Sequence, residues 1–274
     1  MAYLIYCFTK VPPQNWPDLP TGINNQPVTL LPVGAVGAVC STSPHEQDLS
    51  DFAPVLLHQE IVDAVFAHNP VVPVRFGSQM ETREDLISHL TTFAGHYEKQ
   101  LSAIRGFVEI GIRVLLQTVN DDVSQPEQTN RLQNNASDSL HSPGIAYLRS
   151  RRRVYVGETQ RDAAINHLLS DFKASFKGLF HKVKLEKSFR QIALTYNRET
   201  NRQPPGEKHN SLVSFYFLVK KEQLKHFAAV FRELIRQSSH KLMLTGPWPP
   251  YNFVDPPASD SMTSLLDLQS LPDR

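Results

Sequence analysis

The sequence predicts an α+β protein of two domains with an extended C-terminal tail. Short apolar strands and amphipathic helices alternate in both halves of the chain, and several strands follow one another as hairpin-like pairs. A polar stretch without apolar periodicity separates the two halves. The 274 residues, 41% of them hydrophobic, suffice for a core in each half. The predicted boundaries are 1–117 for the first domain, 118–141 for a polar linker, 142–246 for the second domain and 247–274 for the tail.

Three strands are expected at the beginning of the first domain. Residues 2–9 are rich in aromatic and branched side chains, which favour a strand. A proline-rich loop follows, and residues 28–31 and 34–41 then predict two further short strands. Pro32 and Gly34 mark the turn or bulge between those two strands.

Two helices and two strands complete the predicted first domain. Asp48, Ser50 and Asp51 offer an N-cap region for a helix that ends before Pro70. An apolar strand over residues 71–76 follows, and a second helix begins near Thr82, where Glu84 and Asp85 complement its N-terminal dipole. Residues 107–117 alternate polar and apolar side chains and are expected to be the last strand of this half.

The second domain is expected to be a modified ferredoxin-like sandwich, because a helix, strands, a helix and a strand follow one another. Ser142 and Pro143 suit the start of a long helix that runs to about Leu179. The remaining elements are strands at 183–188, 189–197 and 211–220, a helix at 221–237 and a strand at 241–245. The acidic tail is expected to pack loosely, with at most one helical turn at 264–268.

Composition excludes several classes of function. The formal net charge of +1 gives no long-range field toward nucleic acid or an anionic membrane. Cys7 and Cys40 lie in apolar strands, which favours buried, reduced thiols over a secreted disulfide framework. The sequence lacks a signal-peptide pattern and an apolar run long enough to cross a bilayer, so we expect a cytoplasmic protein.

No motif for catalysis, a cofactor or a metal is found. The eleven histidines include no His-x-x-x-His pair, and the two cysteines do not form a Cys-x-x-Cys motif. Neither a nucleophile elbow nor a Walker A loop is present. Gly34 and Gly37 resemble part of a dinucleotide loop, but a third glycine and a following helix are missing. We therefore expect a protein that is not an enzyme and holds no cofactor or metal.

Basic residues suggest two sites for partner binding or for structure. Arg149 and Arg152 belong to a cluster of arginines on the long helix, which suits either a solvated face or a partner-docking face. Arg75 interrupts an apolar strand just before Phe76, so an internal ion pair is favoured for it, with a contact at a partner interface as the alternative.

An aromatic segment near the C-terminus is a third candidate. Three prolines stiffen residues 247–250. Trp248 lies among these prolines, and Tyr251 follows them. A rigid aromatic segment can dock in a groove with little loss of entropy. We expect that groove to lie on the protein itself, and a groove on a partner is the alternative.

Three stretches together resemble the gas vesicle protein GvpL/GvpF family. They are Val-Pro-Val-Arg-Phe-Gly at 72–77, Ala-Tyr-Leu at 146–148, which contains Tyr147, and Leu-Thr-Gly-Pro-Trp-Pro-Pro-Tyr-Asn-Phe at 244–253. The resemblance extends from Tyr3 to Phe253 and does not decide between the L-like and F-like branches.

The resemblance implies a two-domain α+β protein that is needed to form gas vesicles or is a minor component of them. Its expected partners are the major shell protein, which is small and very hydrophobic, and other gas vesicle accessory proteins. It implies a chaperone-like or nucleation-like role, because such a shell subunit is prone to aggregate before assembly. A ligand-sensing regulatory protein with a ferredoxin-like domain is the alternative; an enzyme or an RNA-binding module fits the residues less well.

Overall fold

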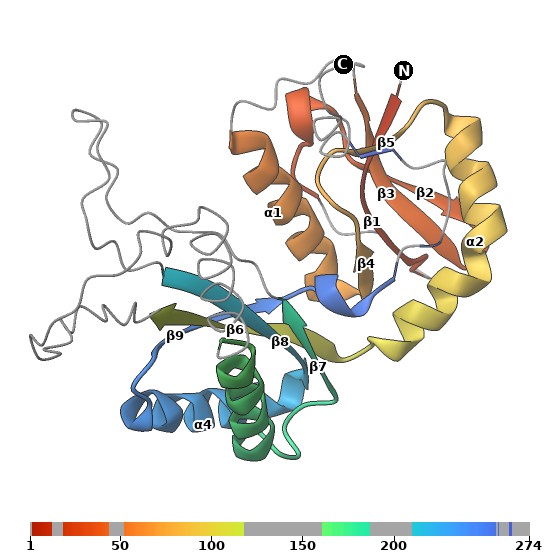
Figure 1. Cartoon of the computed structure of the whole chain (residues 1–274). Coiled ribbons are helices and arrows are strands. Elements are labelled where there is room, and N and C mark those ends of the chain that lie inside the picture. Colours follow the sequence, from red (N-terminus) through yellow and green to blue (C-terminus); the bar gives the residue numbers. More distant parts are fainter. Residues whose placement is uncertain are drawn as a thin grey trace, which may run out of the picture.

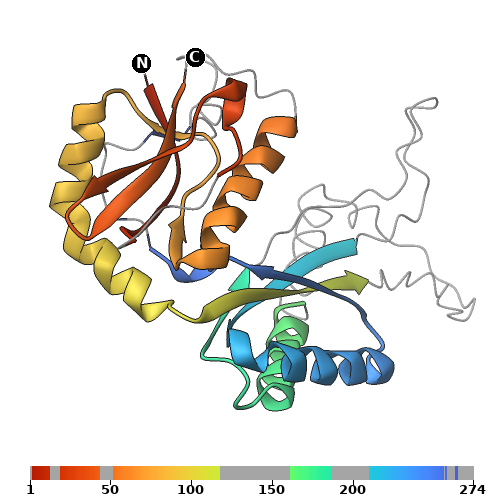
Figure 2. The ribbon, with the colours of Figure 1, turned by 180° about the vertical axis from the view of Figure 1, so that it is seen from behind.

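The protein consists of two antiparallel sheets, each with its own helices. The structure is a computed structural model that describes residues 2–12, 19–43, 52–117, 161–186, 210–255, 257 and 263–264. Figures 1 and 2 show the two sheets side by side, with the helices packed on their faces. The mixed α and β composition agrees with the prediction from sequence, and the chain passes from one sheet to the other between α2 and β6.

The first sheet has β1 at its centre. Its strand order is β10-β5-β1-β3-β2, and β4 also pairs with β1, all antiparallel. The strands are β1 Ala2–Lys10, β2 Thr29–Val33, β3 Val36–Ser43, β4 Val71–Pro73, β5 Ser78–Met80 and β10 Thr263–Ser264. Ser264 thus lies in a strand, where the sequence had suggested a helical turn.

Helices cover both faces of this sheet. The helix α1 (Ala53–His68) contributes Ile61 and Val65 to a cluster with Leu4 and Tyr6 on one face of β1. The helix α2 (Arg83–Ala103) packs against the other face of β1, where Ile5 lies. Burial on both faces explains why β1 is apolar from Ala2 to Phe8 and does not alternate.

Local signals place α2 where the sequence predicts it. The Thr82 hydroxyl accepts a hydrogen bond from the Asp85 backbone N–H at 3.0 Å, which satisfies one of the unpaired donors of the first turn. Both predicted acidic residues, Glu84 and Asp85, lie in that turn. The two cysteines are buried and free, as the sequence suggests.

The second sheet is built from β6 (Phe107–Gln117), β7 (Lys182–Glu186), β8 (Asn210–Lys220) and β9 (Lys241–Trp248). Its strand order is β7-β8-β6-β9, again antiparallel. The prediction that residues 107–117 complete the first half is wrong, because β6 pairs with β8 along its whole length and also with β9. Alternation of polar and apolar residues predicts a strand with one buried face but does not name its partner.

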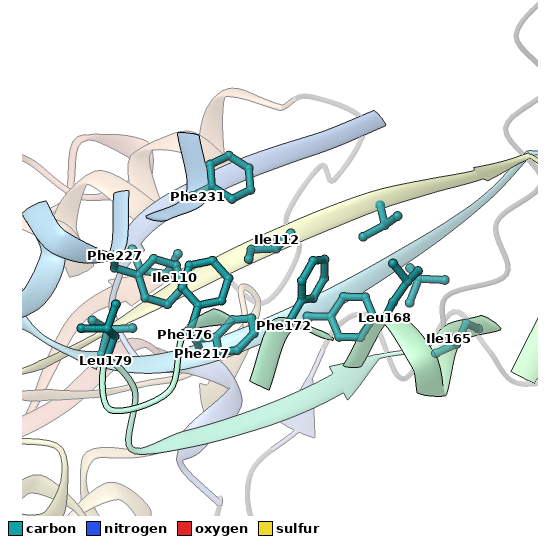
Figure 3. Close-up of a cluster of buried hydrophobic side chains, with 14 of the residues drawn as sticks. Ile110, Ile112, Ile165, Leu168, Phe172, Phe176, Leu179, Phe217, Phe227 and Phe231 are labelled. Carbon is teal, nitrogen blue, oxygen red and sulfur yellow. The ribbon is translucent and has the colours of Figure 1, made fainter. Parts of the chain in front are cut away.

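Two helices cover one face of this sheet. They are formed by residues 161–175 and by α4 (Leu224–Gln237), which follows a short 3-10 turn, η2 (Lys221–Gln223). Figure 3 shows their aromatic side chains meeting those of the strands. Phe176 stacks on Phe227 with ring centroids 4.1 Å apart, and Phe172 meets Phe215 edge to face at 5.0 Å. The predicted strand at 189–197 and the predicted helical residues 143–160 lie outside the described residues.

Candidate functional site

The stretch after β9 returns from the second sheet to the first, and we call residues 249–255 the strap. Pro249 and Pro250 are buried, and the 3-10 turn η3 (Tyr251–Phe253) follows them. Figures 1 and 2 both show η3 between the lower end of α1 and the second sheet. After the strap, Thr263 and Ser264 form β10 at the edge of the first sheet.

The strap is anchored to the second sheet by a buried carboxylate. Glu109 of β6 is only 2% exposed, and its carboxylate accepts hydrogen bonds from the backbone N–H and the side-chain Nδ2 of Asn252, both at 2.7 Å. Burial raises the pKa of Glu109, and the two hydrogen bonds from Asn252 oppose that rise because they favour the ionised form. A buried carboxyl group with two donors on one neighbour is a specific attachment point.

The strap is anchored to the first sheet unit through both of its helices. The Tyr251 hydroxyl donates to Gln59 Oε1 of α1 at 3.0 Å. On α2, His96 Nε2 donates to the backbone carbonyl of Asp255 at 2.9 Å, and Gln100 Oε1 accepts from the Asp255 backbone N–H at 3.2 Å. Burial raises the pKa of Tyr251, which keeps its hydroxyl protonated as a donor.

Two stretches singled out by the sequence meet in one apolar cluster. Phe76 and Tyr251 both pack against the cluster that contains Leu4, Tyr6 and Ile61. The segment that carries Phe76 is held by His58 of α1, whose Nε2–H donates to the Val74 carbonyl at 3.3 Å, and whose ring meets Phe76 edge to face. The first and third of the unusual stretches are therefore neighbours in space, about 170 residues apart in sequence.

Arg75 does not have the environment that the sequence suggests. Its side chain is exposed, in the turn closed by the hydrogen bond from the Ser78 N–H to the Arg75 carbonyl. The favoured internal ion pair is therefore wrong, because it required a half-buried guanidinium. The turn points Arg75 outward while the residues beside it, Val74 and Phe76, pack inward.

The other candidate residues divide into two groups. Tyr251 contacts the body of the protein, as expected for an internal groove, whereas Trp248 at the end of β9 remains 39% exposed. Tyr147, Arg149 and Arg152 lie outside the described residues.

The sequence reasoning missed Glu109 and Gln59, which hold the strap. Glu109 carries one signal that could have been used, because it stands alone as a carboxylate between Val108 and Ile110 at the start of an apolar strand. Gln59 carries none, since a glutamine on a helix is ordinary. Asn252 lies in the third stretch, residues 244–253, of which the sequence alone indicates only Trp248 and Tyr251 as candidates.

An apolar surface lies at the beginning of α1. Phe52 is 80% exposed, Leu56 63% and Val55 39%, and we call these three residues the α1 patch. Large apolar side chains that gather on a surface mark a site of protein contact more often than isolated ones do. In the part of the chain that the structure describes, no group of His, Cys, Asp and Glu could hold a metal ion, and no helix is long and apolar enough to cross a membrane.

Together, the fold and the strap define an α+β protein of two antiparallel sheets whose C-terminal segment ties the second sheet to the first. The family model described as "Gas vesicle synthesis protein GvpL/GvpF" matches residues 2–255. The chain belongs to this family, as the three stretches indicate.

Individual relatives agree with this assignment. Gas vesicle protein L1 of Halobacterium salinarum is 22% identical over 253 residues, which cover 85% of this chain and 83% of the relative. Gas vesicle protein F of Streptomyces sp. is 24% identical over 269 residues, 93% of this chain and all of the relative.

Two crystal structures share the fold. The gas vesicle protein GvpF from Anabaena sp. PCC7120 superposes with a TM-score of 0.64 at 13% identity, and covers 93% of this chain and 96% of its own. GvpF from Microcystis aeruginosa gives a TM-score of 0.62 at 14% identity, with 93% and 99% covered. At such low identity the likeness concerns the fold alone.

Proposed function

We propose that this protein is an accessory factor for assembly of the gas vesicle, or a minor component of it, and that it binds the hydrophobic shell subunit. The family match over residues 2–255 carries the proposal. The protein acts by docking, without bond-making chemistry of its own, in the cytoplasm and at the vesicle, together with other gas vesicle accessory proteins. Binding of the shell subunit before assembly would keep its apolar surface away from water and from other copies.

The α1 patch is the docking surface that we propose for the shell subunit. Phe52, the N-cap residue of α1, and Leu56 in its first turn are exposed to solvent, where they can cover apolar surface of a partner. Burying two such side chains contributes on the order of 3–6 kcal/mol before the costs of association. The strap holds α1 in place through Gln59, which lies one turn further along the helix than Leu56.

We also propose that the second sheet unit belongs to the ferredoxin-like class. The support is the order of its elements: β6, the helix that includes residues 161–175, β7, β8, α4 and β9, that is strand, helix, strand, strand, helix, strand. The prediction from sequence lacked the first of these strands, because it assigned residues 107–117 to the first domain.

Co-purification tests the proposal for the shell subunit. The full-length chain with an affinity tag is co-expressed with the shell subunit, and the amount of captured subunit is measured for the wild type and for a Phe52→Ser/Leu56→Ser variant. Ile235→Ser on α4 is the matched control, since Ile235 is 44% exposed but lies on the other sheet unit. We expect capture by the wild type and the control and a loss of about tenfold or more in the double variant.

A second experiment addresses the role in the cell. Deletion of the gene in a vesicle-forming host should remove the vesicles or reduce their number under the electron microscope. Normal vesicles in normal number, or a wild-type chain that captures no shell subunit, would overturn the proposed function.

A further inference from the structure

The strand β9 has one side without a partner among the described residues. It stands at the end of the order β7-β8-β6-β9 and pairs with β6 through residues 241–248, as seen in Figure 2. A strand in this position directs a row of backbone N–H and C=O groups away from its sheet. These groups match the backbone of another extended chain, so the chemistry of the edge itself specifies a strand as its occupant.

Two other edge strands of the described part of the chain, β7 and β2, carry residues that hinder pairing with a new strand, whereas the middle of β9 does not. Along β7, the exposed side chains are Lys182, Lys184 and Glu186, which would place charges against an incoming strand. Within β2, Pro32 removes a backbone donor and is exposed. β9 begins with Lys241 and contains Pro247 near its end, but residues 242–245 between them are Leu-Met-Leu-Thr, without a charge or a proline. Proteins normally block an open edge with charged residues or prolines, so an unblocked stretch indicates a binding site.

The side chains of this edge offer apolar contacts on both faces of the sheet. Met243 is 50% exposed on the face away from the helices, beside Arg113 of β6 in the strand register. Leu242 and Leu244 are half-buried on the opposite face, where they pack against the helical core. An added strand would therefore bury apolar side chains at alternate positions on either face.

The charges beside Met243 favour one kind of occupant of the edge over another. Arg113 and Lys241 are both exposed and lie on the same face as Met243, so this end of the edge is positive. A second copy of this chain would bring two more positive charges to the same face. A strand with carboxylates at that end would instead gain attraction, because unlike charges across neighbouring strands stabilise the pair.

We propose that the edge formed by residues 241–245 of β9 binds an extended segment of a partner protein, which joins the second sheet as its fifth strand. The segment carries apolar side chains beside Leu242, Met243 and Leu244 and a carboxylate beside Lys241. The choice of partner rests on the proposed function, since we look for the segment among the other gas vesicle proteins. The edge lies on the second sheet unit, whereas the α1 patch lies at the start of α1 on the first, so the two are separate contacts.

The experiment uses the full-length chain and synthetic peptides. Overlapping peptides of about ten residues, which together cover the shell subunit and the other gas vesicle proteins of the host, are labelled and titrated by fluorescence anisotropy. We expect binding by peptides that combine alternating apolar residues with Asp or Glu, and weaker binding as salt rises from about 0.05 to 0.5 M. Met243→Lys places a charge in the middle of the edge and should weaken binding about tenfold or more. Thr92→Lys, an exposed position on α2, is the control with the same added charge.

Backbone methylation of a bound peptide tests the geometry. Alternate N–H groups of a strand point to opposite edges, so methylation of one set should abolish binding and methylation of the other should not. The proposal is overturned if no peptide binds, if Met243→Lys binds like the wild type, or if both methylated forms bind. It is also overturned if sedimentation shows a dimer that Met243→Lys dissociates, since a second copy then occupies the edge.

The outcomes separate this inference from the proposed function. If Met243→Lys still captures the full-length shell subunit while no peptide binds, the inference falls and the proposed function stands. If peptides of another vesicle protein bind at the edge while the wild type captures no shell subunit, the inference stands and shell binding falls.

Discussion

Replacing Asn252 by alanine should loosen the strap from the second sheet. In the wild type, the Asn252 side chain donates one of the two 2.7 Å hydrogen bonds that the buried Glu109 carboxylate accepts. A hydrogen bond to a charged group contributes about 1.5–3 kcal/mol, and here its loss leaves a carboxylate oxygen in a site that is 2% exposed. We expect Asn252→Ala to lower the free energy of strap opening by about 2 kcal/mol.

Hydrogen exchange of the strap amides measures this change directly. A loss of about 2 kcal/mol in the opening free energy corresponds to exchange about thirtyfold faster for amides in residues 251–255. Gln237→Ala is the matched control, because Gln237 also donates an amide hydrogen bond to a carboxylate, that of Glu233 at 2.9 Å, but on the exposed surface of α4. The control should change stability by less than about 0.5 kcal/mol.

The loss of stability caused by Asn252→Ala should depend on pH, and the direction of this dependence follows from the titration of Glu109. Burial raises the pKa of Glu109 in the folded protein, so this carboxyl stabilises the fold most below its unfolded pKa, and that contribution is lost as pH rises through the folded value. Asn252 opposes this loss because its N–H groups favour the ionised carboxylate. The cost of Asn252→Ala should therefore be larger at neutral than at acidic pH. A cost that is independent of pH, or exchange in residues 251–255 as slow as in the wild type, would refute this reasoning.

Three further predictions concern stability. Burial lowers the pKa of His58 from 6.5 to about 4, so the stability of the wild type relative to His58→Gln should fall by about 3 kcal/mol as pH drops from 6.5 to 4. Urea unfolding at several pH values measures this change, and parallel pH profiles of the two proteins would contradict it. Gly246→Ala should lower the free energy of unfolding in urea by about 2 kcal/mol, because φ of Gly246 is +102° and a Cβ there would lie 2.7 Å from the Glu109 carbonyl oxygen. An unfolding midpoint equal to that of the wild type would show that this strain is absent. Phe176→Ala should lower the free energy of unfolding by about 3–5 kcal/mol, measured by heat or urea, because it leaves a cavity against Phe227. A loss below about 1 kcal/mol would mean that the core closes around the cavity.

Local signals in the sequence were sufficient for most elements. Thr82 with Glu84 and Asp85 marks the start of α2, and the structure has its N-cap at Thr82. The alternating residues of 107–117 predict β6 with its bounds as found. Such elements are predictable because capping and side-chain alternation act between residues close in sequence.

Contacts between distant residues were the part that local signals could not supply. The pattern of β6 is the same whichever sheet it joins, so its pairing with β8 and β9 had to come from the three-dimensional structure. The exposure of Arg75 is a similar case, since an arginine in an apolar run fits both a buried ion pair and an outward turn.

By itself, the sequence determined the family, the mixed α and β composition, and the stiffness of the segment around Trp248 and Tyr251, because each of these depends on residue types at short range. Only the tertiary structure decided which sheet β6 enters, which residues hold the strap and which edge is left open. The physical reason is that Glu109 and Asn252 lie 143 residues apart in sequence, and only the fold brings them within hydrogen-bonding distance.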